Sequence, residues 1–247
     1  MPNIYLSPST QEYNPYITGN GSEEYFMNLI ADAMEPYLRA NGIQFTRNTP
    51  EMTAASSIAQ ANRGNYDFYL ALHSNASGPG NEGATRGIIA FYYPTSSNGR
   101  RAANIFVEHL RQIYPLPNRV TTRATTALGE VRQPKAPAVL IELGYHDNTS
   151  DALWIEGNIN LIAQNLVMSL AEYFGIPFVY PGPVSRGRVT TQGGALNLRS
   201  YPSSTGTVIG KLPNGAEVMV YGQYESWYVV GYDGQTGYAA ESYIELL

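Results

Sequence analysis

The sequence of 247 residues predicts an α/β fold, in which helices cover both faces of a twisted, mostly parallel sheet, followed by a small β-barrel. Up to about residue 175, short apolar runs alternate with segments whose apolar residues recur at helical spacing, which is typical of a covered parallel sheet. Beyond that point the apolar residues alternate with polar ones in short runs separated by turn residues, which is typical of a small barrel. The length is ample for both parts.

The first elements follow from local patterns. A strand is predicted over residues 4–6, and Ser22 is predicted to cap the helix that follows. Glu23 and Glu24 lie in the first turn of this helix, where the helix dipole favours negative charge. Pro36 is expected to kink or end its last turn. The remaining elements before residue 75 are a strand over 43–46, a weak helix over 53–61 and a buried strand over 66–72 that ends at His73.

The rest of the chain divides at a proline-rich segment. A loop rich in Gly, Asn, Ser and Pro over 74–87 precedes a strand over 88–93, a helix over 102–113, an apolar strand over 137–143 and a helix over 154–170 that Gly175 stops. We expect domains over 1–175 and 186–247, joined by a stiff linker over 176–185. The predicted barrel strands are 189–191, 196–199, 217–221, 227–231, 236–239 and 243–245.

Composition excludes several classes of function. Only 14% of the residues are charged, the formal net charge is −5 and no basic block occurs, so a nucleic-acid partner has no electrostatic footprint. No apolar run approaches the roughly 20 residues that span a bilayer, and the N-terminus has no pattern of a secretory signal. The chain has no Cys, which excludes thiolate chemistry, and its three His are His73, His109 and His146.

Two polar residues lie at or near the ends of apolar strands of the predicted sheet. His73 ends one strand and Glu142 lies near the end of another, so both are expected at one edge of the sheet, where Glu23 and Glu24 open a helix. An imidazole with carboxylates makes a suitable zinc shell, and a further carboxylate can act as general base. A structural reading stays open at this point, in which His73 only caps its strand and Glu142 is a satisfied polar group.

Two stretches of the first domain carry a family resemblance. They are Leu-His-Ser-Asn at 72–75 and Val-Leu-Ile-Glu-Leu-Gly-Tyr at 139–145, supported by Ile-Tyr-Leu-Ser-Pro-Ser at 4–9. In this order and at this distance they resemble the zinc-dependent N-acetylmuramoyl-L-alanine amidase family (amidase type 3), which cleaves peptidoglycan. The resemblance covers roughly two thirds of the chain.

The resemblance implies an activity and roles for residues. His73 is expected to be a zinc ligand, with either Glu23 or Glu24 as another, and Glu142 is expected to be the catalytic carboxylate. The expected reaction is hydrolysis of the amide bond between N-acetylmuramic acid and L-alanine, with Glu142 as the general base that takes a proton from a zinc-activated water. Asn75 is expected to line the substrate groove.

One position departs from the family pattern. The matching stretch has Thr10 where the family's first His ligand stands, and Glu12 or Tyr13 is the expected replacement. His109, on a helix, and His146, in a loop, are expected to be structural. The alternative function is therefore an impaired amidase-like protein that binds peptidoglycan without cleaving it.

Residues 186–246 resemble a bacterial SH3-type domain. The resemblance rests on Ala-Leu-Asn-Leu-Arg at 195–199, Trp-Tyr-Val-Val at 227–230 and the final Gly-Tyr-Ala-Ala at 237–240. It implies docking on the cell wall, with Trp227 and Tyr228 as binding residues and peptidoglycan as the partner. The expected place of action is the bacterial cell wall or the extracellular space, reached from the cytoplasm by lysis or a non-standard route.

Overall fold

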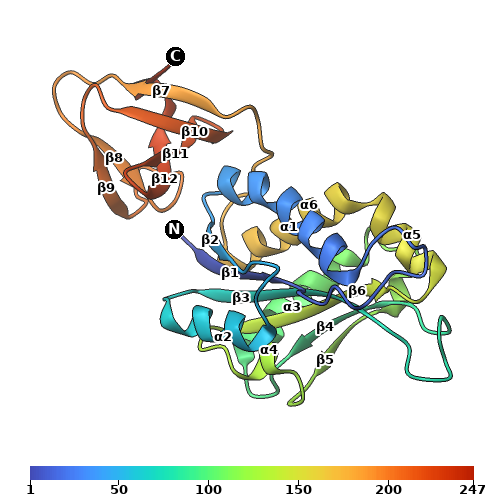
Figure 1. Cartoon of the computed structure of the whole chain (residues 1–247). Coiled ribbons are helices and arrows are strands. Elements are labelled where there is room, and N and C mark those ends of the chain that lie inside the picture. The colour runs from blue at the N-terminus through green and yellow to red at the C-terminus, as the bar shows by residue number, and fades with distance from the viewer. The chain divides into compact units, whose positions relative to one another are not determined.

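The chain forms two compact units in the computed structural model, which describes residues 1–247 (Figure 1). The first unit, called the α/β unit below, comprises residues 3–34 and 45–173. The second, called the barrel unit, comprises residues 1–2, 35–44 and 174–247. No helix of the structure combines the length and the apolar character that crossing a membrane requires.

A six-stranded sheet with the order β2-β1-β3-β6-β4-β5 organises the α/β unit (Figure 1). β1, β3 and β6 run parallel, β4 pairs with β6 antiparallel, and β5 runs parallel to β4. The expected mostly parallel sheet is confirmed, with one reversal at β4. The strands are β1 (Asn3–Pro8), β2 (Gln44–Arg47), β3 (Phe68–Asn75), β4 (Ile88–Tyr92), β5 (Val120–Ala124) and β6 (Ala138–Tyr145).

Helices cover both faces of this sheet, as the sequence predicts. Alternating side chains of β3 separate the faces: the Tyr69 face packs with residues of α2 and α4, and Phe68 on the other face contacts Phe106 of α3 and Tyr173 of α6. The helices are α1 (Glu23–Ala40), α2 (Ala54–Arg63), α3 (Ser97–Leu110), α4 (Gly129–Arg132), α5 (Thr149–Gly157) and α6 (Ile159–Phe174), with a 3-10 turn at Pro117–Arg119.

Four details differ from the expected elements, and the first is that the strand expected over 189–191 lies at Ser185–Val189 (β7). Pro36 lies inside α1, which continues to Ala40, so the expected end of the helix is wrong; the side chains of Leu38 and Ala40 in the turn beyond it are fully buried and stabilise that turn. The predicted helix over 154–170 is two helices, since α5 ends at Gly157 and α6 begins at Ile159. β5, β9 and α4 were not predicted, because β5 and β9 have largely exposed side chains and a four-residue helix is too short to show a period.

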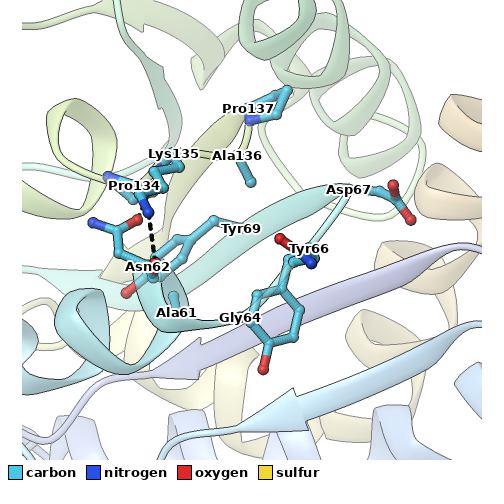
Figure 2. Close-up of a pocket in the computed structure, with 11 residues that line it drawn as sticks. Ala61, Asn62, Gly64, Tyr66, Asp67, Tyr69, Pro134, Lys135, Ala136 and Pro137 are labelled. Atoms are coloured by element: carbon cyan, nitrogen blue, oxygen red, sulfur yellow. Dashed lines mark hydrogen bonds between the residues drawn. The ribbon is translucent and has the colours of Figure 1, made fainter.

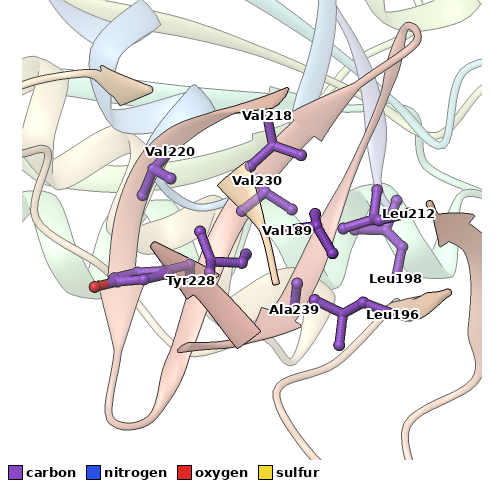
Figure 3. Close-up of a cluster of buried hydrophobic side chains, with 10 residues drawn as sticks. Val189, Leu196, Leu198, Leu212, Val218, Val220, Tyr228, Val230 and Ala239 are labelled. Carbon is purple, nitrogen blue, oxygen red and sulfur yellow. The ribbon is translucent and has the colours of Figure 1, made fainter. Parts of the chain in front are cut away.

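The barrel unit contains a seven-stranded sheet with the order β13-β7-β10-β11-β12-β8-β9, which confirms the predicted small β-barrel. All neighbouring strands of this sheet are antiparallel, and alternate side chains fill one core, which Figure 3 shows. Gly175, with φ +67°, follows α6 directly. The strands are β7 (Ser185–Val189), β8 (Leu196–Arg199), β9 (Val208–Leu212), β10 (Glu217–Tyr224), β11 (Trp227–Tyr232), β12 (Gln235–Ala240) and β13 (Ile244–Leu246), with a 3-10 turn at Glu241–Tyr243.

Candidate active site

The parallel register of the central strands brings polar side chains to one edge of the sheet. β3 lies between β1 and β6, so the carboxyl ends of the three strands meet there. In this register His73 of β3 stands beside Glu142 of β6. His73 is 8% exposed, which places a titratable ring in a largely dry position at the edge where open α/β sheets bind ligands.

His73 is held between two buried carboxylates. Its Nδ1 lies 2.8 Å from Oε1 of Glu23, which opens α1, and its Nε2 lies 2.8 Å from Oε2 of Glu130 on α4. Burial lowers the pKa of His73, but the hydrogen bonds to Glu130 and Glu23 outweigh it and raise the pKa well above its ordinary value. Burial raises the pKa of each carboxyl group, but His73 and the other hydrogen bonds bring both below their usual range. The three groups form an ion-paired cluster, and this cluster fixes the ring.

Glu130 was missing from the sequence-based candidates. Its Oε1 accepts hydrogen bonds from Ser7 Oγ and from Tyr69 Oη, both at 2.7 Å, so its second oxygen is free to accept from His73. This arrangement fixes the carboxylate and, through it, the orientation of the imidazole. The single turn that carries Glu130 has no periodic pattern, so no signal in the sequence pointed to it.

The loop after β1 supplies two further polar side chains. Gln11 Nε2 lies 3.3 Å from Nδ1 of His73, and Asn14 Nδ2 donates to Glu23 Oε2 at 2.7 Å and to Gln11 Oε1 at 3.1 Å. The backbone N–H of Glu23 donates to the carbonyl of Asn14 at 2.9 Å, which anchors this loop to the start of α1. Sequence reasoning missed both residues, because amides in a loop rich in polar residues carry no distinguishing pattern.

Glu142 lies in a different environment from the other two carboxylates. Its Oε2 is inaccessible to solvent and has no hydrogen-bond partner. Burial raises the pKa of Glu142 to about 7, with His73 opposing the increase and Glu23 and Glu130 adding to it. A carboxyl group with this pKa takes up and returns a proton readily near neutral pH, which is what a general acid–base catalyst needs.

The structure separates the remaining candidates from the ring of His73. Glu24 is partly exposed and has no hydrogen bond to His73, so Glu23 is the member of the pair that the fold brings to the site. Glu12 is exposed, and Tyr13 is 77% exposed and donates its hydroxyl proton to Gln11 Oε1 at 3.1 Å. Thr10 is partly buried in the same loop.

Other predicted residues have local roles. Asn75 Oδ1 accepts from the backbone N–H of Ala76. His146 is buried, with Nδ1 2.8 Å from the carbonyl oxygen of Ser74. His109 Nε2 lies 2.7 Å from Oε2 of Glu172, so both of these His residues lie outside the cluster of His73.

Two cavities of the α/β unit differ in chemistry. One, of about 360 Å³, is lined by His73 and Glu130 and by residues of the loop over 9–13, so it gives access to the cluster. The other, of about 410 Å³, lies at the amino ends of β3 and β6 and is shown in Figure 2. Its charged side chains are Asp67 and Lys135, and Lys135 Nζ donates to the carbonyl of Asn62 at 2.9 Å. The first cavity is therefore the candidate substrate site.

The donors around His73 meet part of what a zinc ion needs. A catalytic zinc takes three protein ligands and keeps one position open. His73 Nδ1 and the Glu23 carboxylate are two suitable donors at one place, and Glu130 lies on the opposite side of the ring. No group of three or more His, Cys, Asp or Glu side chains is arranged to hold a metal ion. His73 Nδ1 and Glu23 therefore supply two of the three protein ligands that a catalytic zinc site needs.

The raised pKa of Glu142 makes a prediction for stability without metal. A carboxyl whose folded pKa is raised from 4.5 to about 7 stabilises the fold fully below the unfolded pKa and loses that contribution as pH rises through about 7. Glu142→Gln removes this loss. Relative to the wild type, the free energy of unfolding of the variant should increase by up to about 3 kcal/mol between about pH 4.5 and about pH 8. Urea unfolding in chelator measures it, and parallel pH profiles for the two proteins would contradict it.

The strand ends thus define a class of protein: an α/β protein with a buried imidazole–carboxylate site at its sheet edge. The sequence profile of the N-acetylmuramoyl-L-alanine amidase family matches residues 5–172, and that of the bacterial SH3 domain matches residues 194–245. The chain belongs to the N-acetylmuramoyl-L-alanine amidase family, and its enzyme class is that of the family, an amide hydrolase.

Solved structures share the fold of the α/β unit. The N-acetylmuramoyl-L-alanine amidase AmiC2 of Nostoc punctiforme is 16% identical with a TM-score of 0.62, over 70% of this chain and 97% of that one. The catalytic domain of the amidase CwlV from Bacillus (Paenibacillus) polymyxa var. colistinus is 19% identical with a TM-score of 0.62, over 72% and 100%. The catalytic domain of the CD27L endolysin, which targets Clostridia difficile, is 20% identical with a TM-score of 0.56, over 70% and 98%. A search of curated proteins finds no match.

Proposed function

We propose that this protein cleaves the amide bond between N-acetylmuramic acid and L-alanine in peptidoglycan, with a zinc ion held by His73 and Glu23 and with Glu142 as the group that moves the proton. The observation that carries the proposal is the pairing of His73 Nδ1 with the Glu23 carboxylate, beside a carboxyl group whose pKa is near 7. Membership of a generally zinc-dependent amidase family supports it.

The side chains divide the work of hydrolysis. Glu130 accepts the Nε2 proton of His73 and so directs Nδ1 toward Glu23. A zinc ion bound there would polarise the scissile carbonyl and acidify a water molecule. Glu142 takes the proton of the attacking water and gives it to the departing amine of L-alanine, which its pKa of about 7 favours in both directions.

We place wall recognition in the barrel unit. A cavity of about 350 Å³ there is lined by Trp227 and Tyr243, with Arg199 as its one charged side chain. Flat aromatic faces beside a guanidinium suit a peptide that carries a carboxylate, as the stem peptide of peptidoglycan does. Trp227 takes the predicted binding role, whereas Tyr228 points to the other side of β11 and lies in the barrel core (Figure 3).

Replacing Trp227 should weaken wall binding without affecting the fold. Trp227→Ala removes the largest aromatic surface of the cavity, so we expect a loss of affinity for insoluble peptidoglycan of about tenfold or more. Co-sedimentation with purified walls measures it. Tyr201→Ala, an aromatic residue of the same unit that is 44% exposed and lies outside this cavity, is the control. Equal wall binding by the two variants would show that this cavity does not bind the wall.

A second candidate function is binding of peptidoglycan without turnover. The absence of a group of three His, Cys, Asp or Glu side chains arranged for a metal favours it. In that case the SH3-type domain and the cavity beside His73 bind the wall, and Glu142 transfers no proton.

The same domain boundaries are proposed for either function: a catalytic part over 1–175, a linker over 176–185 and a wall-binding part over 186–247.

Product analysis tests the proposed function. Purified walls are digested with the full chain, and the soluble products are identified by mass spectrometry. The proposal expects stem peptides with a free L-alanine amine and glycan strands that keep their lactyl groups. Walls that bind the protein and release nothing would support the second candidate, and disaccharide peptides would contradict the assigned bond.

A further inference from the structure

We infer that the side-chain carboxamide of Gln11 is the third protein ligand of this metal site. The inference rests on the proposed function, because it requires a metal ion between His73 and Glu23. It differs from the family pattern, in which an imidazole is expected at the position of Thr10. It also replaces the sequence-based expectation that Glu12 or Tyr13 completes the set.

Glu130 fixes which nitrogen of His73 is available to a metal ion. Glu130 lies 2.8 Å from Nε2, and its other oxygen is occupied by Ser7 and Tyr69, so the Nε2 proton has a fixed acceptor. The lone pair that remains for a metal is therefore on Nδ1. Around Nδ1 lie Glu23 Oε1 at 2.8 Å and the carboxamide of Gln11 at 3.3 Å. Nδ1 and these two side chains come from three separate segments of the chain and meet at one place.

The two hydrogen-bond contacts of His73 Nδ1, with Glu23 and with Gln11, require opposite protonation states of this nitrogen. To bond Glu23 the nitrogen must carry a proton, but to accept from the Nε2 group of Gln11 it must have none. One nitrogen cannot do both. A metal ion in place of the proton removes the conflict, because Nδ1 and Glu23 then both bind the ion and Gln11 turns its oxygen toward it.

Hydrogen bonds from Tyr13 and Asn14 position the Gln11 side chain. Tyr13 Oη and Asn14 Nδ2 both lie 3.1 Å from Gln11 Oε1, and Asn14 also donates to Glu23 Oε2 at 2.7 Å. When the carboxamide is turned over, its NH₂ group donates to the Tyr13 hydroxyl, and Asn14 gives up its bond to Gln11 but keeps its bond to Glu23. Gln11 is partly buried, whereas Glu12 and Tyr13 are exposed. Among these neighbours, only the Gln11 side chain reaches Nδ1.

A carboxamide oxygen is a neutral donor and is harder than an imidazole nitrogen. The expected site therefore binds zinc more weakly than a set with two His residues would, and Gln11→His should strengthen it. Gln11→Ala removes the ligand, and Gln11→Asn keeps the amide but is one methylene too short to reach.

Metal titration of the full chain tests the assignment. Protein freed of metal with a chelator is titrated with zinc in a calorimeter and with cobalt(II) in a spectrophotometer. We expect zinc affinity to fall about tenfold or more in Gln11→Ala and Gln11→Asn, with an altered cobalt d–d spectrum. Gln112→Ala, an exposed glutamine of the same unit, should titrate like the wild type. Thermal melting of the metal-free proteins confirms that each variant is folded.

The outcomes separate the inference from the proposed function. If the wild type binds zinc and both Gln11 variants bind it within about twofold, Gln11 is not a ligand and the amidase proposal stands. If the wild type binds no zinc, the ligand assignment is overturned, and digestion of walls by the metal-free protein then decides whether the amidase proposal survives. A tenfold loss confined to the Gln11 variants supports the assignment.

Discussion

Glu142→Gln is expected to lower the rate of peptidoglycan hydrolysis by about 10²–10⁴-fold, with wall binding unchanged. Glutamine has nearly the same shape as glutamate, but it cannot take the proton of water or give it to the leaving amine. Glu142 Oε2 has no hydrogen-bond partner, so the substitution breaks no side-chain bond of that oxygen. The loss of rate should therefore come without loss of stability.

The rate is measured by release of L-alanine amino groups from purified walls. Glu108→Gln, an exposed carboxylate of α3 in the same unit, is the matched control and should keep the wild-type rate. A Glu142→Gln variant that cleaves at more than about a tenth of the wild-type rate would contradict the assigned role.

His73→Ala is expected to abolish zinc binding and to destabilise the α/β unit by about 3–5 kcal/mol near neutral pH. The ring separates the buried carboxylates of Glu23 and Glu130 and pairs with both, so its removal leaves two unpaired buried charges. Both carboxyl groups have lowered pKa values in the fold, so the stability that they gain from His73 is present above about pH 4.5 and is lost as pH falls through those lowered values.

Chemical unfolding as a function of pH measures this effect. The difference between wild type and His73→Ala should be largest near neutral pH and should shrink in acid. His109→Ala removes a His that pairs with a single, mostly exposed carboxylate, and it should cost about 1 kcal/mol or less. Equal costs for the two substitutions would show that the carboxylates do not depend on His73. The larger cost expected for His73→Ala comes from its double ion pair with Glu23 and Glu130.

Long-range periodicity was enough to predict the main fold. The apolar runs that became β1, β3 and β6 are buried on both faces and are continuous in the sequence, and their parallel order places His73 next to Glu142. The same pattern predicted the helices on both faces. It did not reveal the reversal at β4, because an apolar strand reads the same in both directions.

The candidate site was predicted only where a residue ends a regular element. His73 and Glu142 belong to strands, and Glu23 opens a helix, so register and helix position identify them. Glu130 comes from one turn of helix and Gln11 from a loop, and their roles depend on tertiary contacts with His73. Local sequence rules carry no information about such contacts, and this is why the third ligand was sought at Glu12 and Tyr13.

The alternation of side chains along a strand explains the outcome in the barrel unit. Trp227 and Tyr228 are neighbours in β11, so they point to opposite faces. One lines the cavity and the other fills the core. The SH3-type resemblance implied a binding role for both residues, because it does not assign the face of the strand to which each side chain points.

His73 Nδ1 and Glu23 are proposed to hold a zinc ion beside Glu142. Crystals of the full chain grown with zinc, with diffraction data collected above and below the zinc absorption edge, test this claim directly. We expect an anomalous peak within bonding distance of His73 Nδ1, a Glu23 oxygen and the Gln11 carboxamide, with Glu130 still bonded to Nε2. No peak at this position, with Nδ1 still bonded to Glu23, would contradict it.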